Sequence, residues 1–123
     1  MDAIVILSAV SLLGAGNNIN YNWCIIEDAT VTTVSWTDAG ANSSVEYTIS
    51  GTAITGGKIL ASGYFNSSTQ SSIPIQILRD ILFRFQLQRN SLANTVSTLS
   101  IAVAAGTDNS NIFGSLDWEE ISR

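Results

Sequence analysis

The spacing of turn-forming residues is the feature that most constrains how this chain folds. Segments rich in Gly, Asn, Ser and Asp interrupt it at short intervals, around residues 14–20, 38–44, 50–57, 66–72, 89–94 and 105–111. The runs between them have strand length and are rich in β-branched and aromatic residues, which suit a pleated sheet. Such frequent breaks leave no room for long helices. We therefore predict an all-β chain, a single antiparallel two-sheet β-sandwich domain over residues 1–123, with about eight strands and a jelly-roll-like order.

Two of the runs, residues 3–13 and 99–105, are apolar at successive rather than alternate positions. Strands of this kind are buried on both faces, so we expect the two to lie centrally in a sheet or to face a neighbouring subunit. A secretory signal is the alternative for residues 3–13, although Asp2 occupies the place of the usual basic residue. The run is far shorter than the roughly 20 residues of a membrane-spanning helix, and we expect no membrane partner.

Other segments make narrower predictions. Apolar and polar residues alternate over 45–50, which indicates a half-buried strand. Residues 73–88 fit both a helix face and a strand alternation, and we favour a strand for their second half. Trp23 and Trp36 lie within apolar runs, where core packing is expected. The single cysteine, Cys24, is expected to be a buried packing residue rather than a nucleophile.

The chain carries little charge for its length. Apolar residues make up 46% of it and charged residues 12%, and ten acidic against five basic residues give a net charge of −5. The surface must then be neutral and rich in hydroxyl and amide groups, so we expect part of it to be covered by a partner. Binding to nucleic-acid phosphates needs clustered positive charge, and we expect no nucleic-acid partner.

Two small clusters of opposite charge stand out against this neutral background. They are Arg79, Arg84 and Arg89 on one side, and Asp117, Glu119 and Glu120 near the C-terminus on the other. The clusters can meet within one chain or between copies. We take them, together with Trp118, as candidate interface residues, because aromatic side chains are enriched at interfaces.

The residues that most catalytic sites need are missing. The chain has no histidine and one cysteine, which excludes Ser-His-Asp and Cys-His catalysis and Cys/His metal sites. The run from Gly51 to Gly57 approaches the spacing of a phosphate-binding loop, but Ile59 stands where Ser or Thr should bind magnesium. Residues 108–111 place oxygen ligands at alternate positions but lack the glycine and glutamate of a calcium loop. We expect no cofactor and no metal.

Two alternatives to an assembly role remain open from the residues alone. A carbohydrate-binding module would use Trp118, Tyr64 or Tyr21 as a stacking platform, because aromatic rings with polar groups suit sugars. A glycosidase would use Asp117 and Glu120 as its carboxylate pair. Their place at the chain end favours a solvated or interfacial cluster over a cleft, and we expect the chain not to be an enzyme.

Three stretches of the sequence form a distinctive set. They are Trp36-Thr37-Asp38 with Ala41-Asn42-Ser43-Ser44-Val45-Glu46-Tyr47, then Gly56-Gly57-Lys58-Ile59-Leu60-Ala61-Ser62-Gly63-Tyr64, and finally Gly114-Ser115-Leu116-Asp117-Trp118-Glu119-Glu120-Ile121. Together they resemble small β-sandwich virion structural proteins of tailed bacteriophages. The similarity covers roughly residues 21–121, and its motifs are structural rather than catalytic. It implies a sandwich that ends in the acidic, Trp-containing strand and has the 56–64 stretch as a central strand.

Within that group, the small size and the absence of fibre repeats are most like a capsid decoration (cement) protein. Such proteins commonly sit as homotrimers on the three-fold positions of the capsid and join neighbouring hexamers. The resemblance therefore implies a structural protein of the virion's capsid surface, assembled in the host cytoplasm, with the major capsid protein and copies of itself as partners. It transfers no functional residue. Residues 3–13 depart from the flexible polar arm of many such proteins, which keeps a tail or neck position with a carbohydrate- or receptor-binding role as the alternative.

Overall fold

The computed structural model describes residues 3–68, 87–89 and 96–122. Every regular element within those ranges is a strand, and all strand pairs are antiparallel. The strands are β1 (Ala3–Gly14), β2 (Asn20–Glu27), β3 (Thr30–Thr32), β4 (Thr37–Asp38), β5 (Glu46–Tyr47), β6 (Ala53–Thr55), β7 (Lys58–Asn66), β8 (Leu87–Arg89), β9 (Leu99–Ala105) and β10 (Ile112–Ser122). The prediction of an all-β antiparallel chain is confirmed.

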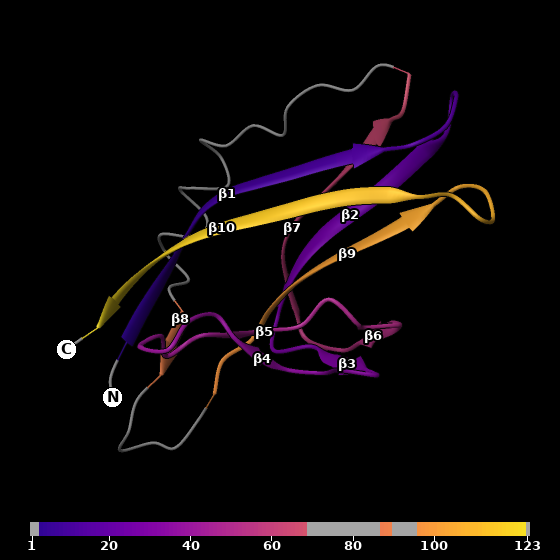
Figure 1. Ribbon diagram of the computed structural model, residues 1–123. Coiled ribbons are helices and arrows are strands. Elements are labelled where there is room, and N and C mark those ends of the chain that lie inside the picture. Colours follow the sequence, from indigo (N-terminus) through magenta and orange to yellow (C-terminus); the bar gives the residue numbers. More distant parts are fainter. Residues whose placement is uncertain (1–2, 69–86, 90–95, 123) are drawn as a thin grey trace.

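Two three-stranded sheets form the layers of a sandwich (Figure 1). Their strand orders are β10-β1-β8 and β7-β2-β9. The core lies between them, where Leu7 and Val10 of β1 pack with Trp23 and Ile25 of β2. All four side chains are buried. The predicted two-sheet sandwich is confirmed.

Part of what the sequence predicts falls on residues 69–86 and 90–95, outside the described ranges. Arg79 and Arg84 belong to this part, as does most of the 73–88 segment. The end of that segment, where a strand is predicted, enters β8. The jelly-roll order stays a prediction, because it depends on connections that run through these residues.

β1 is a central strand, as its apolar character predicts, with β10 on one side and β8 on the other. Leu7 and Val10 both face the core although they are three positions apart, which the two-residue period of a regular strand does not allow. A β-bulge resolves this conflict. The register with β10 shifts between Leu7 and Ala9, so that Ser8 is an extra residue without a partner on β10. This pairing favours a structural strand over a secretory signal for residues 3–13.

β2 is the central strand of the second sheet. Its alternate residues Tyr21, Trp23 and Ile25 are buried on the inner face, whereas Cys24 lies on the outer face and is only half-buried. Burial of Trp23 is confirmed, and full burial of Cys24 is not found. Among the described strands, β7 and β9 are the outer members of the sheet, so the 56–64 stretch is not central among them, and its expected central place stays a prediction.

A glycine on β7 leaves the space that the Trp23 ring occupies. Gly63 is the register partner of Trp23, and a Cβ atom at Gly63 would lie 2.9 Å from three atoms of the indole ring. Non-bonded carbon atoms prefer about 3.5–4.0 Å, so any larger residue at this position would displace the ring. The packing of the largest core side chain therefore depends on the absence of a side chain opposite it.

Tyr21 closes the end of the sandwich at which β1 turns into β2 and β9 turns into β10. Its ring stacks on that of Phe65, with 5.0 Å between centroids and an interplanar angle of 11°. A Cβ atom at Gly14 would lie 2.3 Å from the ring, so glycine is required there. The Tyr21 hydroxyl shares its proton between the carbonyl oxygens of Ala15, at 2.8 Å, and Asn111, at 3.1 Å. One buried side chain thus ties both turns together.

Two small sheets, β3 with β6 and β4 with β5, lie apart from the sandwich in the lower part of Figure 1. The half-buried strand predicted over 45–50 is wrong: β5 has two residues, and Ile49 is 93% exposed. The expected burial of Trp36 is also wrong, since it is 48% exposed beside β4. Neither segment forms a strand of the sandwich, so their apolar side chains are not buried between its two sheets.

The turn Gly56-Gly57 carries the chain from one of the small sheets into the sandwich. Both glycines have positive φ, 68° and 79°, which residues with a side chain rarely adopt. A Cβ atom at Gly57 would also meet the Glu27 carbonyl oxygen and the side chain of Ile26 at 2.7 Å. The glycines that approach a phosphate-loop spacing therefore form a tight turn over β2, between β6 and β7.

Candidate functional site

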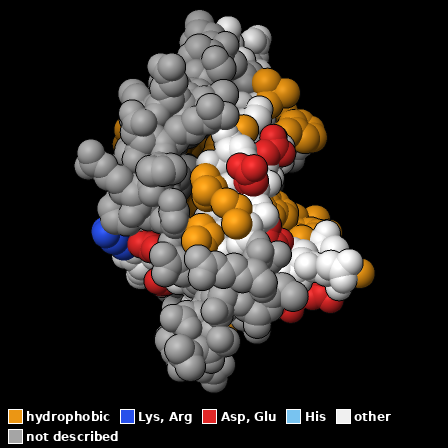
Figure 2. Space-filling view, turned by 90° about the vertical axis from the view of Figure 1, so that its left-hand side faces the viewer, with side chains coloured by type: hydrophobic (Ala, Val, Ile, Leu, Met, Phe, Trp, Pro, Cys, Tyr) orange, Lys and Arg blue, Asp and Glu red, His pale blue; other side chains and the backbone are white. Residues whose placement is uncertain are grey.

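An open, mostly apolar groove of about 1000 Å³ lies between the sandwich and the small sheets. One wall is the inner side of β1, β9 and β10, and the other comes from residues 44–49 and 51–54. Figure 2 shows apolar side chains gathered around the hollow, with acidic side chains near them. The groove is a concave feature formed by described residues, and we take it as the candidate binding surface of this chain.

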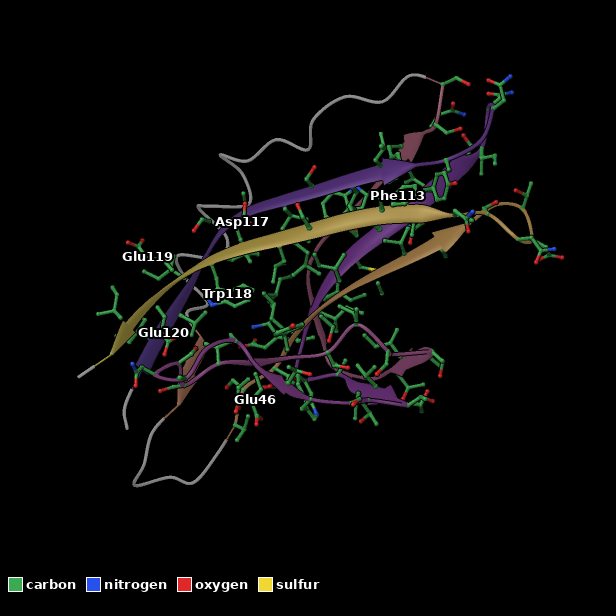
Figure 3. The ribbon with its side chains drawn as sticks, in the orientation of Figure 1. Glu46, Phe113, Asp117, Trp118, Glu119 and Glu120 are labelled. Carbon is green, nitrogen blue, oxygen red and sulfur yellow. The ribbon has the colours of Figure 1, made fainter. Side chains whose placement is uncertain are left out.

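The alternation of β10 decides which of its side chains reach the groove. Ile112, Leu116 and Trp118 line it together with Gly114 and Ser115, whereas Phe113 and Asp117 do not. Figure 3 shows Trp118 on the side of β10 that faces the small sheets. Trp118 is half-buried and pairs with Leu7 of β1 across the sheet. Its indole ring belongs to the groove wall.

Several apolar side chains of the groove remain in water. Trp36 is 48% exposed, Tyr47 42%, Ile49 93% and Val96 71%. A contiguous group of exposed apolar residues is uncommon on a protein that acts alone, and it marks a surface that another molecule covers. The groove therefore has the character of an unfilled interface.

Charged side chains are scarce in the groove. Among the described residues that line it, Glu46 alone carries a charge. Asp117 and Glu120 lie on opposite faces of β10, because they are three positions apart on a regular strand. Two carboxyl groups so placed do not flank one glycosidic bond. Within the described part of the chain, no three acidic or cysteine residues come close enough together to hold a metal ion.

Glu120 holds the β4–β5 hairpin against the sandwich. Its carboxylate accepts a hydrogen bond from the Ser43 hydroxyl and another from the Ser44 backbone N–H, both at 2.6 Å. The Ser43 hydroxyl also accepts a hydrogen bond from the Val45 N–H, at 3.0 Å. These bonds, first that from Ser43 and then that from Ser44, lower the pKa of Glu120 below its ordinary value of 4.5, against the opposing effect of burial.

We expect Glu120→Gln to lower the free energy of unfolding at neutral pH by at most about 1 kcal/mol, because the hydrogen bonds weaken but the site is partly solvated. A carboxyl whose pKa is depressed in the folded state stabilises the fold above its unfolded pKa and loses that contribution as the pH falls through its folded pKa. Urea titrations at pH 7 and about pH 3 should give a larger difference between variant and wild type at pH 7 than at pH 3. Glu119→Gln, on the opposite face of β10, is the matched control. A difference of equal size at both pH values would contradict the anchoring role.

The other residues predicted for an interface are divided between two faces. Asp117 and Glu119 are exposed on the outer face of β10, where Phe113 and Ile121 are 62% and 51% exposed. Arg89 of β8 and Ser122 of β10 both pair with Ala3 of β1, so β8 and the acidic strand β10 flank the same strand within a single chain. A contact between the basic and the acidic residues, within one chain or between copies, stays a prediction.

Sequence reasoning missed the role of residues 43–54 in the groove. Their apolar members alternate like those of a strand, and no local signal distinguishes a strand of the sandwich from a segment that lines its open side. The Ser43–Ser44 pair that binds Glu120 likewise carries no signal in the sequence, because its partner lies 77 positions away.

Comparisons of the chain with protein-family models, with curated proteins and with solved structures found no match. No helix capable of spanning a membrane occurs in the described ranges.

Proposed function

We propose that the chain is a non-enzymatic structural protein of a phage virion, which decorates and stabilises the capsid by binding between capsid subunits as an oligomer. The observation that carries the proposal is the open apolar groove, whose exposed Trp36, Tyr47, Ile49 and Val96 call for a covering protein surface. The assignment to a capsid rests on the resemblance of the three stretches described above.

The composition supports the same role. With 12% charged residues, the chain has few charged groups that association would have to remove from water. Burial of exposed apolar surface supplies the main free energy of association. A sandwich with such an exposed apolar surface is stabilised most when the surface is buried in an assembly.

The mechanism of stabilisation is mass action. A ligand that binds the intact lattice, and not its dissociated or unfolded subunits, stabilises the lattice by the free energy of binding. Many copies bound to one shell add avidity, because each oligomer engages more than one capsid subunit at once. This mechanism needs no catalytic group, only a rigid domain with a surface that fits two neighbours.

We infer a homotrimer as the oligomer, with the basic residues of one copy near β10 of the next. Size-exclusion chromatography with light scattering on the purified chain measures this directly. Mixing the chain with undecorated capsids of the virus that encodes it should give saturable, stoichiometric binding and raise the melting temperature of the capsids. The absence of both effects would remove the decoration role.

Ile49→Glu tests whether the groove is the associating surface. Ile49 is 93% exposed in the groove, so the change should leave the fold intact while it places a charge in the contact. We expect at least about a tenfold loss of self-association or of capsid binding, equivalent to roughly 1.4 kcal/mol. Ile59→Glu is the matched control, because Ile59 is exposed on β7 away from the groove. Equal losses in both variants, or none in either, would contradict the assignment of the groove.

A further inference from the structure

The outer face of the sheet β7-β2-β9 carries no charge over most of its described length. Over Asn20–Cys24, Ser62–Asn66 and Ala102–Ala104 there is no acidic or basic residue. In contrast, the outer face of β10 carries Asp117 and Glu119. A ligand with a phosphate or carboxylate group has no counter-charge on this sheet face, so the face suits an uncharged ligand.

One aromatic ring stands up from this face. Tyr64 of β7 is 81% exposed, and it shares its row of the sheet with Asn22 of β2 and Ala104 of β9. Ser62 is its neighbour along the same face of β7. Because the side chains of Ser62 and Ala104 are short, the Tyr64 ring projects above its neighbours and one side of it is accessible to a ligand.

A group of side-chain amides lies next to the ring. Asn66 donates from Nδ2 to Oδ1 of Asn20, at 2.8 Å, and to Oδ1 of Asn18, at 3.1 Å. Its own Oδ1 accepts a hydrogen bond from the Ser68 N–H at 2.8 Å, which determines which atom of the amide is nitrogen. The Oδ1 atoms of Asn18 and Asn20 therefore accept hydrogen bonds from Asn66. Their NH₂ groups point away from Asn66 and are available as donors.

Asn22, in the row of Tyr64, supplies a hydrogen-bond acceptor. Its Nδ2 donates to the Gly63 carbonyl oxygen at 3.2 Å, so its Oδ1 is left as an acceptor. Along a strand, residues two positions apart lie roughly 7 Å from each other on one face. Tyr64 and Asn66 are two positions apart on β7, so their backbones are separated by about this distance, which is comparable with the size of one sugar ring.

We propose that this outer face binds a neutral saccharide, with Tyr64 as the stacking platform. A sugar offers an apolar C–H face that packs on an aromatic ring, and hydroxyl groups that both donate and accept hydrogen bonds. The Tyr64 ring receives the C–H face, the NH₂ groups of Asn18 and Asn20 donate to hydroxyl oxygens, and Oδ1 of Asn22 accepts a hydroxyl proton. This function goes beyond capsid decoration and uses a different face of the molecule from the groove.

The other aromatic residues considered for a sugar platform are not available for it. Tyr21 is 1% exposed and lies in the core, and Trp118 belongs to the groove wall. Tyr64 therefore carries the stacking role by itself on this face, and a single stacked ring predicts weak, millimolar to micromolar, binding to one sugar unit.

The test is binding of the full chain to an array of neutral and acidic oligosaccharides, followed by titration calorimetry with the neutral oligosaccharide that binds best. We expect binding to neutral members of the array, and at least about a tenfold loss of affinity in Tyr64→Ala. Asn20→Ala should reduce the affinity severalfold. Tyr47→Ala is the matched control, since Tyr47 is an exposed tyrosine of the groove.

Because Tyr64 is so exposed, its replacement should leave the circular dichroism spectrum and the urea midpoint unchanged. Binding that is equal in wild type and Tyr64→Ala would overturn the proposal, as would an array on which no neutral saccharide binds. Binding confined to acidic saccharides would also overturn it, because the face carries no cation to receive them. None of these outcomes depends on whether the chain binds a capsid.

Discussion

Replacing Tyr21 with alanine should lower the free energy of unfolding by about 3–5 kcal/mol, the range for removing a large aromatic side chain from a core. Tyr21 is 1% exposed and stacks on Phe65. Its removal leaves a cavity beside Gly14 and also deprives the carbonyl oxygens of Ala15 and Asn111 of their hydroxyl donor. Since the total stability of a domain is about 5–15 kcal/mol, this loss brings the chain close to unfolding.

Urea titration followed by circular dichroism measures the effect. Tyr21→Phe separates the two contributions, because it retains the ring and removes only the hydroxyl; we expect it to cost about 1–2 kcal/mol. Tyr64→Ala, at an 81% exposed position, should change the stability by less than about 0.5 kcal/mol. If Tyr21→Phe destabilised the chain as much as Tyr21→Ala, packing would not be the main contribution and this account of the turn region would be wrong.

Trp23→Ala should have an effect of similar size, again about 3–5 kcal/mol. Trp23 is 8% exposed and is part of the cluster formed with Leu7, Val10 and Ile25. Gly63, opposite it, has no side chain that can move into the vacated space. The cavity therefore stays largely open, which places the cost toward the upper end of the range.

Trp36→Ala is the matched control for Trp23→Ala. The sequence predicts core packing for both tryptophans, yet Trp36 is 48% exposed. We expect its removal to cost less than about 1 kcal/mol in the isolated chain at low concentration, where association does not contribute. Equal costs for the two substitutions in a urea titration would contradict the placement of Trp36 outside the core.

The success of the strand predictions follows from local physical chemistry. Residues 3–13 and 99–105 form β1 and β9, with almost the bounds that the apolar runs indicate. The breaks at 14–20 and 105–111 coincide with the turns that Tyr21 closes. Turn residues and β-branched residues act through their own backbone preferences, so their effect can be read without knowing the partner strands.

The failures share a different cause. The 45–50 segment alternates as a buried strand does, and yet Ile49 is 93% exposed. The candidate site was predicted only in part: Trp118 lies in the groove wall, whereas Glu120 anchors a hairpin and Asp117 faces the other side of β10. An alternating pattern says that one face is apolar, and it does not say whether another layer covers that face.

The spacing of turn residues determined, by itself, that this protein is built of β-strands joined by frequent turns, because strand preference and turn chemistry are local properties. The tertiary structure alone decided that Ser8 forms a bulge, that Trp23 is buried and Trp36 exposed, and that one side of the sandwich is left open as a groove. These features depend on contacts between distant residues, such as Tyr21 with Asn111, 90 positions apart. Which distant residues meet is settled by the packing of whole sheets, and the sequence of any one strand does not contain that information.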